Sequence, residues 1–280
     1  MNALEIKNLC KSYPGFSLDN LNLTLPSGCI LGLIGENGAG KSTTMKLILD
    51  LIRRDSGTIT ILGRDNREDV RLTREQIGVV MDEAGIPECL TPVQVGKVMG
   101  NIFRSWEPDT YLNLLNRLQL PYTTAFKELS RGMRMKLAIA IAMSHGAKLL
   151  ILDEATSGLD PVVRDEVVQM LSDFTREDDR SILISSHIVS DLEKLCDYIV
   201  FLHKGRRMLF EEKDILLAKY GIVHCTHEQL PLLSPGAVLH RKENPYGAEV
   251  LVLRDAVPRE WKISPVSIED LFIFMVKEAK

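Results

Sequence analysis

The stretch "GENGAGKST", residues 35–43, restricts the fold of this chain more than any other feature. It satisfies the pattern G-x-x-x-x-G-K-[S/T] at every position. The apolar run "CILGLIG" (29–35) precedes it, and the run "KSTTMKLILDLI" (41–52), which is expected to be helical, follows it. A buried strand, a glycine-rich loop and a helix in this order form a phosphate-binding loop. The chain is therefore predicted to have an α/β fold.

Each position of this loop has a chemical reason. Glycine allows the backbone to wrap closely around phosphate oxygens, and successive N–H groups and the helix N-terminus supply partial positive charge. Lys41 adds a full positive charge at the β- and γ-phosphates, and the Ser42 hydroxyl is placed to bind Mg²⁺. The residues expected to bind the nucleotide here are Asn37, Gly38, Gly40, Lys41, Ser42 and Thr43.

The remaining pattern predicts strands that alternate with helices. Residues 1–30 alternate apolar and polar and contain the turn stretches "PGF" and "PSG", which is typical of antiparallel strands. Residues 161–177 have apolar side chains at helical spacing. Apolar runs predict further strands at "SGTITILG" (56–63), "IGVVM" (77–81), "KLLILDE" (148–154) and "SILISSH" (181–187). Strands that alternate with helices indicate a parallel sheet.

We therefore predict a P-loop NTPase core with a parallel sheet, an N-terminal antiparallel β subdomain, a helical insert and a small C-terminal α/β appendage. The nucleotide-binding domain is expected to span residues 1–213. The insert is expected at about 88–145, because that stretch is helical and poor in strands. The sequence pattern of residues 214–280 differs from that of the preceding residues, and this stretch is predicted to form an accessory region.

Two acids follow the apolar run "LLIL". Carboxylates at the end of a strand in an α/β sheet face the ligand crevice. From there, Asp153 can orient the hydration shell of Mg²⁺, and Glu154 can polarise an attacking water. The alternative is that both acids only cap the following helix. Asp160, directly before Pro161, is by itself typical of a helix N-cap.

His187 follows a strand that is expected to lie beside the strand of Asp153 and Glu154. From that edge its side chain could hydrogen-bond a γ-phosphate and hold the attacking water. A histidine at the end of a strand is also often purely structural, and the order of the sequence leaves both interpretations open.

In combination, these motifs resemble the ATP-binding subunit of an ABC transporter over roughly residues 3–212. "GENGAGKST" is similar to the Walker A loop, "LLILDE" to the Walker B motif, "SGLD" (157–160) to the D-loop and "SSH" to the switch-histidine loop. "LSRGM" (129–133) resembles the LSGGQ signature, which most other P-loop ATPases lack. "KSYPGF" places Tyr13 like the aromatic residue that stacks on adenine.

The resemblance implies how these residues work together. Two nucleotide-binding subunits, as a homodimer or a heterodimer, are expected to face each other head to tail. Each ATP then lies between the Walker A loop of one subunit and the signature of the other. Ser130 and Gly132 are expected to contact the γ-phosphate held by the partner subunit, with Asp160 in the nearby D-loop. Glu154 is expected to be the general base, and His187 the second catalytic residue.

The resemblance also implies ATP hydrolysis coupled to transport. Closure of the dimer on ATP is expected to drive a separate membrane-spanning permease, which places the chain in the cytoplasm on the inner face of the cell membrane. The short insert and compact tail resemble exporter-type ATPases of the multidrug, antibiotic and peptide branch. The alternatives are a soluble ABC ATPase that acts on ribosomes or DNA, and a regulatory cassette that binds ATP without hydrolysing it.

The chain departs from the family pattern in two places. The family usually has a glutamine after the strand that reads "IGVVM" here, whereas this chain has Asp82 followed by Glu83. Asp82 is predicted to be an oxygen ligand near Mg²⁺, and the alternative is that both are solvated loop acids. In the signature, Arg131 and Met133 replace the usual glycine and glutamine, and Arg131 is either a further γ-phosphate contact or a surface charge.

The composition argues against several other classes. A net charge of −4 lacks the basic footprint of a general nucleic-acid binder, so no nucleic-acid partner is expected. The longest apolar run (137–143) is far below the roughly 20 residues that cross a bilayer. The five cysteines form no CxxC pair and are expected to be reduced. The residues of "HCTH" (224–227) are explained by alternation along a strand in preference to a zinc site. Trp106 is either an exposed aromatic anchor for docking or part of the core of the insert.

Overall fold

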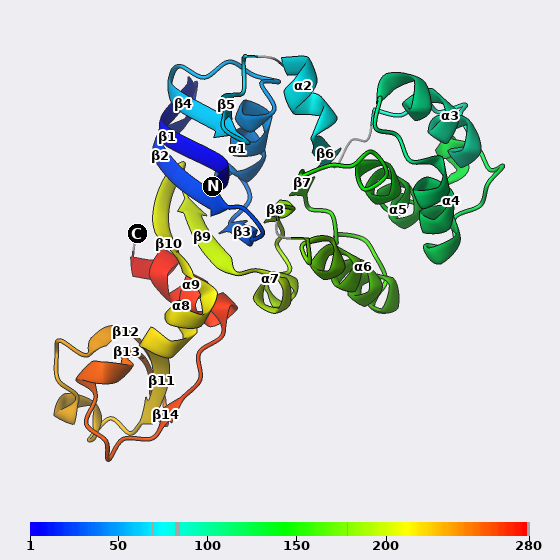
Figure 1. Cartoon of the computed structure of the whole chain (residues 1–280). Helices are drawn as coiled ribbons and strands as arrows, with labels where there is room; N and C mark the ends of the chain where they lie inside the picture. The colour runs from blue at the N-terminus through cyan, green and yellow to red at the C-terminus, as the bar shows by residue number, and fades with distance from the viewer. Residues whose placement is uncertain (69, 82–84, 178, 279–280) are drawn as a thin grey trace.

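The fold is built around a six-stranded sheet (Figure 1). It is seen in a computed structural model that describes residues 1–68, 70–81, 85–177 and 179–278. The strand order is β10-β9-β3-β8-β7-β6, and all neighbours are parallel except β10, which is antiparallel to β9. The strands are β3 (Ile30–Gly35), β6 (Ile77–Val80), β7 (Leu149–Asp153), β8 (Ser181–Ser185), β9 (Tyr198–His203) and β10 (Arg206–Glu212). The predicted parallel sheet is thus confirmed, and β3, β7 and β8 are buried over their full length.

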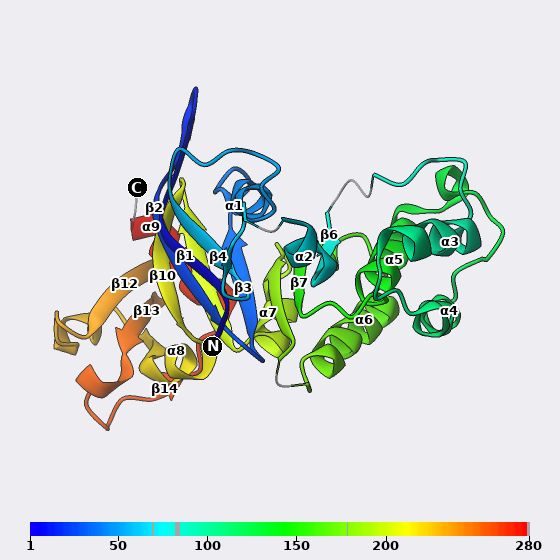
Figure 2. The same cartoon turned by 45° about the horizontal axis from the view of Figure 1, so that its top comes forward.

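The predicted antiparallel β subdomain is also present. Its strand order is β2-β1-β4-β5, with β1 (Asn2–Tyr13), β2 (Phe16–Pro26), β4 (Ser56–Ile61) and β5 (Arg64–Asp65). Helix α1 (Lys41–Ile48) packs between this sheet and the six-stranded one (Figure 2), and its buried Met45 shares one apolar core with Leu4 and Leu33. The helix was predicted to reach residue 52, which is wrong, because Asp50 takes a left-handed conformation (φ 51°) that ends it.

The helical insert lies between β6 and β7 in the chain, beyond the β6 edge of the sheet (Figure 2). Its helix α3 (Pro92–Ile102) begins at a capping box formed by Thr91 and Gln94. Helix α5 (Arg131–Ala142) packs on β6. The further helices around this sheet are α2 (Val70–Glu75), α4 (Pro108–Arg117), α6 (Pro161–Phe174) and α7 (Val189–Leu195). Among the described residues, no helix is long and apolar enough to cross a membrane.

The C-terminal region forms a small antiparallel sheet with the order β12-β13-β11-β14. Its elements are α8 (Lys213–Lys219), β11 (Tyr220–Cys225), β12 (Val238–Asn244), β13 (Gly247–Leu253), β14 (Ile263–Ser264) and α9 (Ile268–Glu278). Val223 and Val250, on one face of this sheet, belong to an apolar core that is formed by the C-terminal region itself. Tyr220 and Leu251 belong instead to the core that contains Phe201 of β9. Figure 1 shows α9 between the small sheet and β9–β10. The division at residues 213 and 214 remains a prediction.

Candidate functional site

The phosphate loop runs from the buried end of β3 into α1. The Lys41 side chain is almost fully buried, and its Nζ donates to the carbonyl oxygens of Gly35 (2.7 Å) and Glu36 (3.3 Å). The ammonium group is therefore held inside the loop. The first turn of α1 contains no acidic residue, and the helix begins at Gly40, which has no side chain to cap it. The N–H groups of that turn are consequently available to an anion.

Two glycines allow the loop to take this path. A Cβ on Gly35 would lie 2.7 Å from the carbonyl oxygen of Leu202 and 2.8 Å from Cβ of Ala39, so no side chain fits there. Gly40 has a φ of 111°, which side chains rarely allow. The N–H of Gly205 donates to the carbonyl of Ala39 at 3.0 Å, which ties the loop to the turn after β9.

Asp153 and Glu154 end β7 at the same edge of the sheet as the phosphate loop. Strand β8 lies between β3 and β7, so the carboxyl ends of three parallel strands meet there. Asp153 is buried, and the Ser185 hydroxyl donates to its Oδ1 at 2.5 Å. Glu154 leaves the strand in a left-handed conformation (φ 55°), and its N–H donates to the carbonyl of Ser185. Such strained residues occur most often at functional sites.

Glu154 and His187 form a direct pair. Glu154 Oε2 accepts the backbone N–H of His187 at 3.2 Å and lies 2.5 Å from its Nδ1. Because a carboxylate can only accept, Nδ1 carries a proton in this contact. The His187 side chain is 57% exposed, so it stands at the surface of the site. The expectation that β8 lies beside β7 is confirmed.

Neither acid caps the helix that follows. Helix α6 is capped by Asp160, whose Oδ1 accepts the N–H of Val163 at 3.1 Å. The alternative that Asp153 and Glu154 serve only as helix caps is therefore wrong. The N-cap expected for Asp160 from its position before a proline is confirmed.

The stretch 129–133 begins a second helix without acids in its first turn. Ser130 is the N-cap of α5, and its Oγ accepts the N–H of Met133 at 3.2 Å. A Cβ on Gly132 would lie 3.4 Å from the carbonyl oxygen of Gly158, so this helix start lies against the "SGLD" stretch. In Figures 1 and 2, α5 lies with the insert while α1 lies on the other side of β6 and β7.

Comparison with known proteins decides the family. A family model described as ABC transporter matches residues 18–157, which is half of the chain. SrtF of Streptococcus pyogenes, a lantibiotic transport ATP-binding protein, is 40% identical over 215 residues, covering 75% of this chain and 91% of SrtF. The ABC transporter ATP-binding protein YtrB of Bacillus subtilis is 30% identical, covering 96% of this chain and 97% of YtrB. The chain belongs to the ABC transporter family.

A solved ATP-binding subunit of an ABC transporter also resembles this ABC subunit. The TM-score is 0.70 at 28% identity, and the match covers 76% of this chain and 91% of the solved one. The protein is accordingly an ATP-binding and ATP-hydrolysing subunit of an ABC transporter. Subunits of this kind dimerise and work with membrane permeases.

Several other residues of this ABC subunit were singled out from its sequence. Tyr13 ends β1 and is 42% exposed as a residue, and Lys11 Nζ lies 5.2 Å from the centroid of its ring. Asp82 and Glu83 lie outside the described residues. Trp106 packs inside the insert against Tyr111, with ring centroids 5.1 Å apart, which favours the core interpretation.

Only the first two residues of the "HCTH" stretch alternate along a strand. His224 is exposed and Cys225 is buried on β11. His227 lies beyond the strand, and its Nε2 is 2.9 Å from the carbonyl oxygen of Asn244, a backbone partner. In the part of the chain that the structure describes, no group of three or more histidine, cysteine or acidic side chains is arranged to hold a metal ion.

The two serines of "SSH" support the ABC site, and the sequence analysis missed them. Ser185 links Asp153 to Glu154, since its hydroxyl donates to the first and its carbonyl accepts from the second. Ser186 accepts the N–H of Ile188 at 2.9 Å and so shapes the backbone next to His187. Two hydroxyl residues between a buried strand and a histidine were the signal that could have revealed them.

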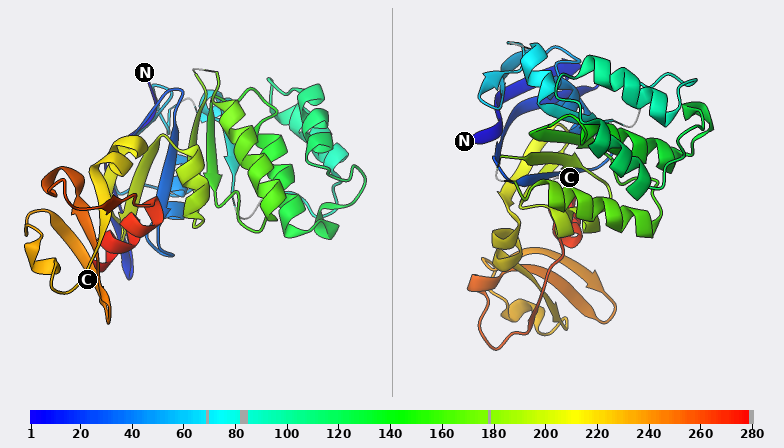
Figure 3. Two further views of the ribbon diagram at one scale, coloured as in Figure 1. Left: turned by 90° about the horizontal axis from the view of Figure 1, so that it is seen from below. Right: turned by 45° about the vertical axis from the view of Figure 1, so that its right-hand side comes forward.

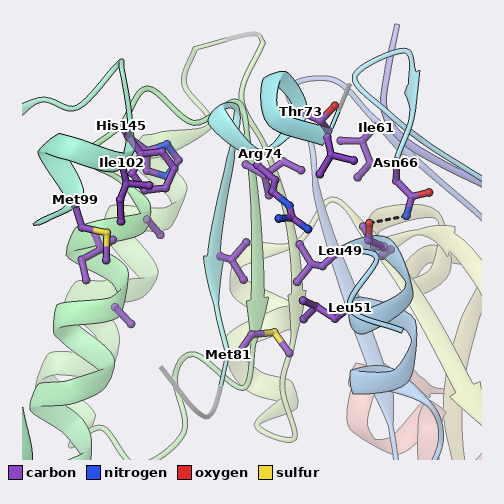
Figure 4. Close-up of a pocket in the computed structure, with 18 of the residues that line it drawn as sticks. Leu49, Leu51, Ile61, Asn66, Thr73, Arg74, Met81, Met99, Ile102 and His145 are labelled. Atoms are coloured by element: carbon purple, nitrogen blue, oxygen red, sulfur yellow. Dashed lines mark hydrogen bonds between the residues drawn. The ribbon is translucent and has the colours of Figure 1, made fainter. Parts of the chain in front are cut away.

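A cavity of about 460 Å³ lies between α1 and the insert (Figure 4). Its walls are mainly apolar, with Leu49 and Leu51 on one side and Met99 and Ile102 on the other. Leu51 and Ile102 are largely exposed although they are apolar. The guanidinium of Arg74 lies between these walls in Figure 4. The sequence analysis did not find this cavity, because its lining comes from six helices and strands and from the loops beside them.

His145 stands on the insert side of this cavity. Its ring stacks on Phe103 with centroids 4.0 Å apart, and Nδ1–H donates to the carbonyl of Glu75 at 3.2 Å. Burial disfavours the charged imidazolium and lowers the pKa of His145, although the hydrogen bond to Glu75 acts in the opposite direction. The folded protein therefore favours the neutral ring.

Proposed function

We propose that this ATPase powers export of a peptide or antibiotic-like cargo through a separate membrane-spanning partner. The observation that carries the catalytic part is the Glu154–His187 pair at the edge of the phosphate loop. The cargo class rests on the relatives, since SrtF is described as a lantibiotic transport protein. In this arrangement the chain acts at the cytoplasmic face of the membrane.

The phosphates of ATP bind to the loop through charge and N–H groups. Lys41 supplies the full positive charge, and the first turn of α1 supplies the helix N-terminus. The exposed Ser42 hydroxyl and the buried Asp153 carboxylate are hard oxygen ligands of the type that Mg²⁺ takes. The bound ion neutralises charge on the β- and γ-phosphates. Asp82 remains a predicted third ligand.

Glu154 acts as the general base in this proposal. Its carboxylate takes a proton from a water whose oxygen attacks the γ-phosphorus, and the bond from that phosphorus to the bridging oxygen of ADP breaks. His187 donates from Nδ1 to Oε2 of Glu154 and thereby orients the carboxylate. Tyr13, exposed at the end of β1, is proposed to stack on the adenine.

A second copy or a related subunit completes each site. The start of α5 lies with the insert and away from the edge that holds Lys41 and Glu154, so it does not face the ATP bound by its own chain. We assign Ser130 and Gly132 to the γ-phosphate bound by the partner subunit, with Asp160 beside it. This arrangement explains why one chain contains two anion-binding helix starts.

The cavity between α1 and the insert is the proposed contact with the membrane partner. An amphipathic helix fits such an apolar groove by inserting side chains at helical spacing. Exposed Leu51 and Ile102 offer the apolar contact, and Arg74 offers a charge that pairs with an acidic residue on the incoming helix. Copurification of the tagged chain from membranes, with Ile102→Asp as the disrupted variant, identifies this partner.

The catalytic assignment is tested with Glu154→Gln. A general base contributes about 10²–10⁴-fold to the rate, so we expect kcat to fall by at least about 100-fold. ATP binding should persist, because Lys41 and α1 are unchanged, and light scattering should show an ATP-stabilised dimer. Glu260→Gln, an exposed acid outside the site and the signature stretch, is the matched control and should behave as the parent. Turnover of ATP by Glu154→Gln at the parental rate would refute the assignment.

A further inference from the structure

Helix α7 connects the catalytic edge to the C-terminal region. It begins two residues after His187, and its N-cap residue Ile188 makes no side-chain hydrogen bond to it. The helix has seven residues (Val189–Leu195), which is too short to be stable in isolation. Its position, and that of the backbone of His187, therefore depends on what packs against it.

Three neighbouring helices, α6, α8 and α9, hold α7 through polar contacts. On one side, Arg164 Nε of α6 lies 3.6 Å from the buried Asp191. On the other side, Glu193 Oε2 accepts the N–H of Ile268, the first residue of α9, at 3.3 Å. Lys213 Nζ donates to the backbone carbonyl of Glu193 at 3.0 Å. The Glu193 carboxylate lies at the N-terminus of α9, and the Lys213 ammonium group lies near the C-terminus of α7. Both charges interact favourably with the dipole of the helix that they contact.

Apolar packing strengthens the link between α7 and α9. The two helices are in contact, and Figure 3 shows α9 beside the six-stranded sheet. Fully buried Leu271 of α9 and Leu192 of α7 belong to one apolar core. Phe272 of α9 meets Phe201 of β9 edge to face, with ring centroids 5.2 Å apart. The C-terminal region thus contacts α7, which follows His187, and β9, which follows α7.

We propose that Glu193 and α9 are positioning elements of the ATPase site, which hold α7 so that His187 stays on Glu154. This rests on the proposed roles of Glu154 and His187. The His187 side chain is mostly exposed, so its location is set by its backbone and not by packing around the ring. A displacement of about 1 Å in such a contact can cost about 100-fold in rate. The packing of the C-terminal region against α7 therefore influences the rate of ATP hydrolysis.

The test uses the purified full-length chain and compares steady-state kinetics. Glu193→Ala removes the acceptor of the Ile268 N–H, and we expect kcat to fall roughly 10-fold with KM for ATP unchanged within about twofold. Glu193→Gln retains a carbonyl acceptor and should restore kcat. Glu269→Ala removes an exposed acid from the first turn of α9, the helix whose start Glu193 contacts, and is the matched control. The NMR signal of the His187 ring, assigned with His187→Gln, should shift only in Glu193→Ala.

Each other outcome argues against the proposal. Parental kcat in Glu193→Ala, while Glu154→Gln is inactive, overturns the role of Glu193 alone. Parental kcat in Glu154→Gln instead overturns the proposed catalytic site. An equal loss in Glu193→Ala and Glu269→Ala shows general weakening of α9 and also overturns positioning. If Glu193→Ala does not fold, Lys213→Met removes the hydrogen bond to the Glu193 carbonyl, a second polar contact between the C-terminal region and α7, and should lower kcat in the same way.

Discussion

At the scale of single residues, Glu154 has a left-handed backbone conformation and a carboxylate that is held by a hydrogen bond. Its left-handed conformation costs about 1–2 kcal/mol for a residue with a side chain. The hydrogen bonds of its N–H to Ser185 and of its carboxylate to His187 offset part of this cost. The conformation turns Glu154 away from the strand direction, so adjacent acids at the end of one strand have different partners. Asp153 contacts Ser185, and Glu154 contacts His187.

His145 predicts how the stability of the protein depends on pH. Burial lowers its pKa in the folded state, so below about pH 6.5 the unfolded chain binds more protons than the folded one. The free energy of unfolding should therefore fall with decreasing pH, by at most about 1.4 kcal/mol per pH unit from this residue. Urea unfolding at pH 7.5 and 5.5 should show a smaller loss in His145→Asn. Equal losses in variant and parent would exclude His145 as a contributor.

At the scale of elements, the start of α5 makes one set of contacts within its own subunit and is proposed to make another set with the partner subunit. Ser130 caps the helix within its own chain, yet the helix start is remote from the Walker A loop. Gly132 and Gly158 bring the signature against the D-loop, so the two motifs present one surface. In the proposed dimer, the two anion-binding helix starts contact the same ATP only when two subunits meet.

Ser130→Arg tests this separation. The added charge and bulk should abolish ATP-driven dimerisation, while nucleotide binding by the monomer stays within about twofold, because Lys41 and α1 are untouched. Dimerisation is measured by light scattering with ATP, and binding by titration with a fluorescent nucleotide. Ser130→Ala removes the same cap, at a cost of about 1 kcal/mol, without added charge or bulk, and its thermal stability is the control for the loss of the cap. Loss of monomer binding would show that Ser130 serves its own chain.

At the scale of the whole molecule, the C-terminal region is joined to the ATPase through a shared apolar core. Leu216, Ile268 and Leu271 are fully buried in the same core as Ile199 and Phe201. Fully burying one such side chain contributes about 1.5–3 kcal/mol. The other face of the small sheet has a core of its own, so the region is only partly self-contained.

Removal of residues 214–280 should therefore destabilise the ATPase. The truncated chain 1–213 exposes the apolar surface that α8 and α9 cover, and we expect a lower Tm, aggregation and a loss of several kcal/mol of stability. Thermal unfolding followed by circular dichroism, with the full chain as reference, measures the effect. The full chain should unfold in one transition. An unchanged Tm of 1–213 would show that the C-terminal region folds independently.

The local order of the residues determined much of the fold and the site. The loop 35–43, the apolar strands around it and the acids at 153 and 154 are consecutive in the chain, so each motif contains its own structural context. For the same reason the family could be identified from "LSRGM" and its companions. The end of α1 was predicted too late because the apolar pattern continues past Asp50, whose backbone conformation is not visible in the pattern.

Only the tertiary structure decided which distant residues meet. It paired Glu154 with His187, placed Ser185 on Asp153, assembled the cavity from six helices and strands and the loops beside them, and set α9 against α7. These contacts join positions that are tens of residues apart and depend on the order of strands in the sheet, which no local pattern encodes. The local sequence thus determines the chemistry of each motif. The fold determines which distant residues contact that motif and hold it in position.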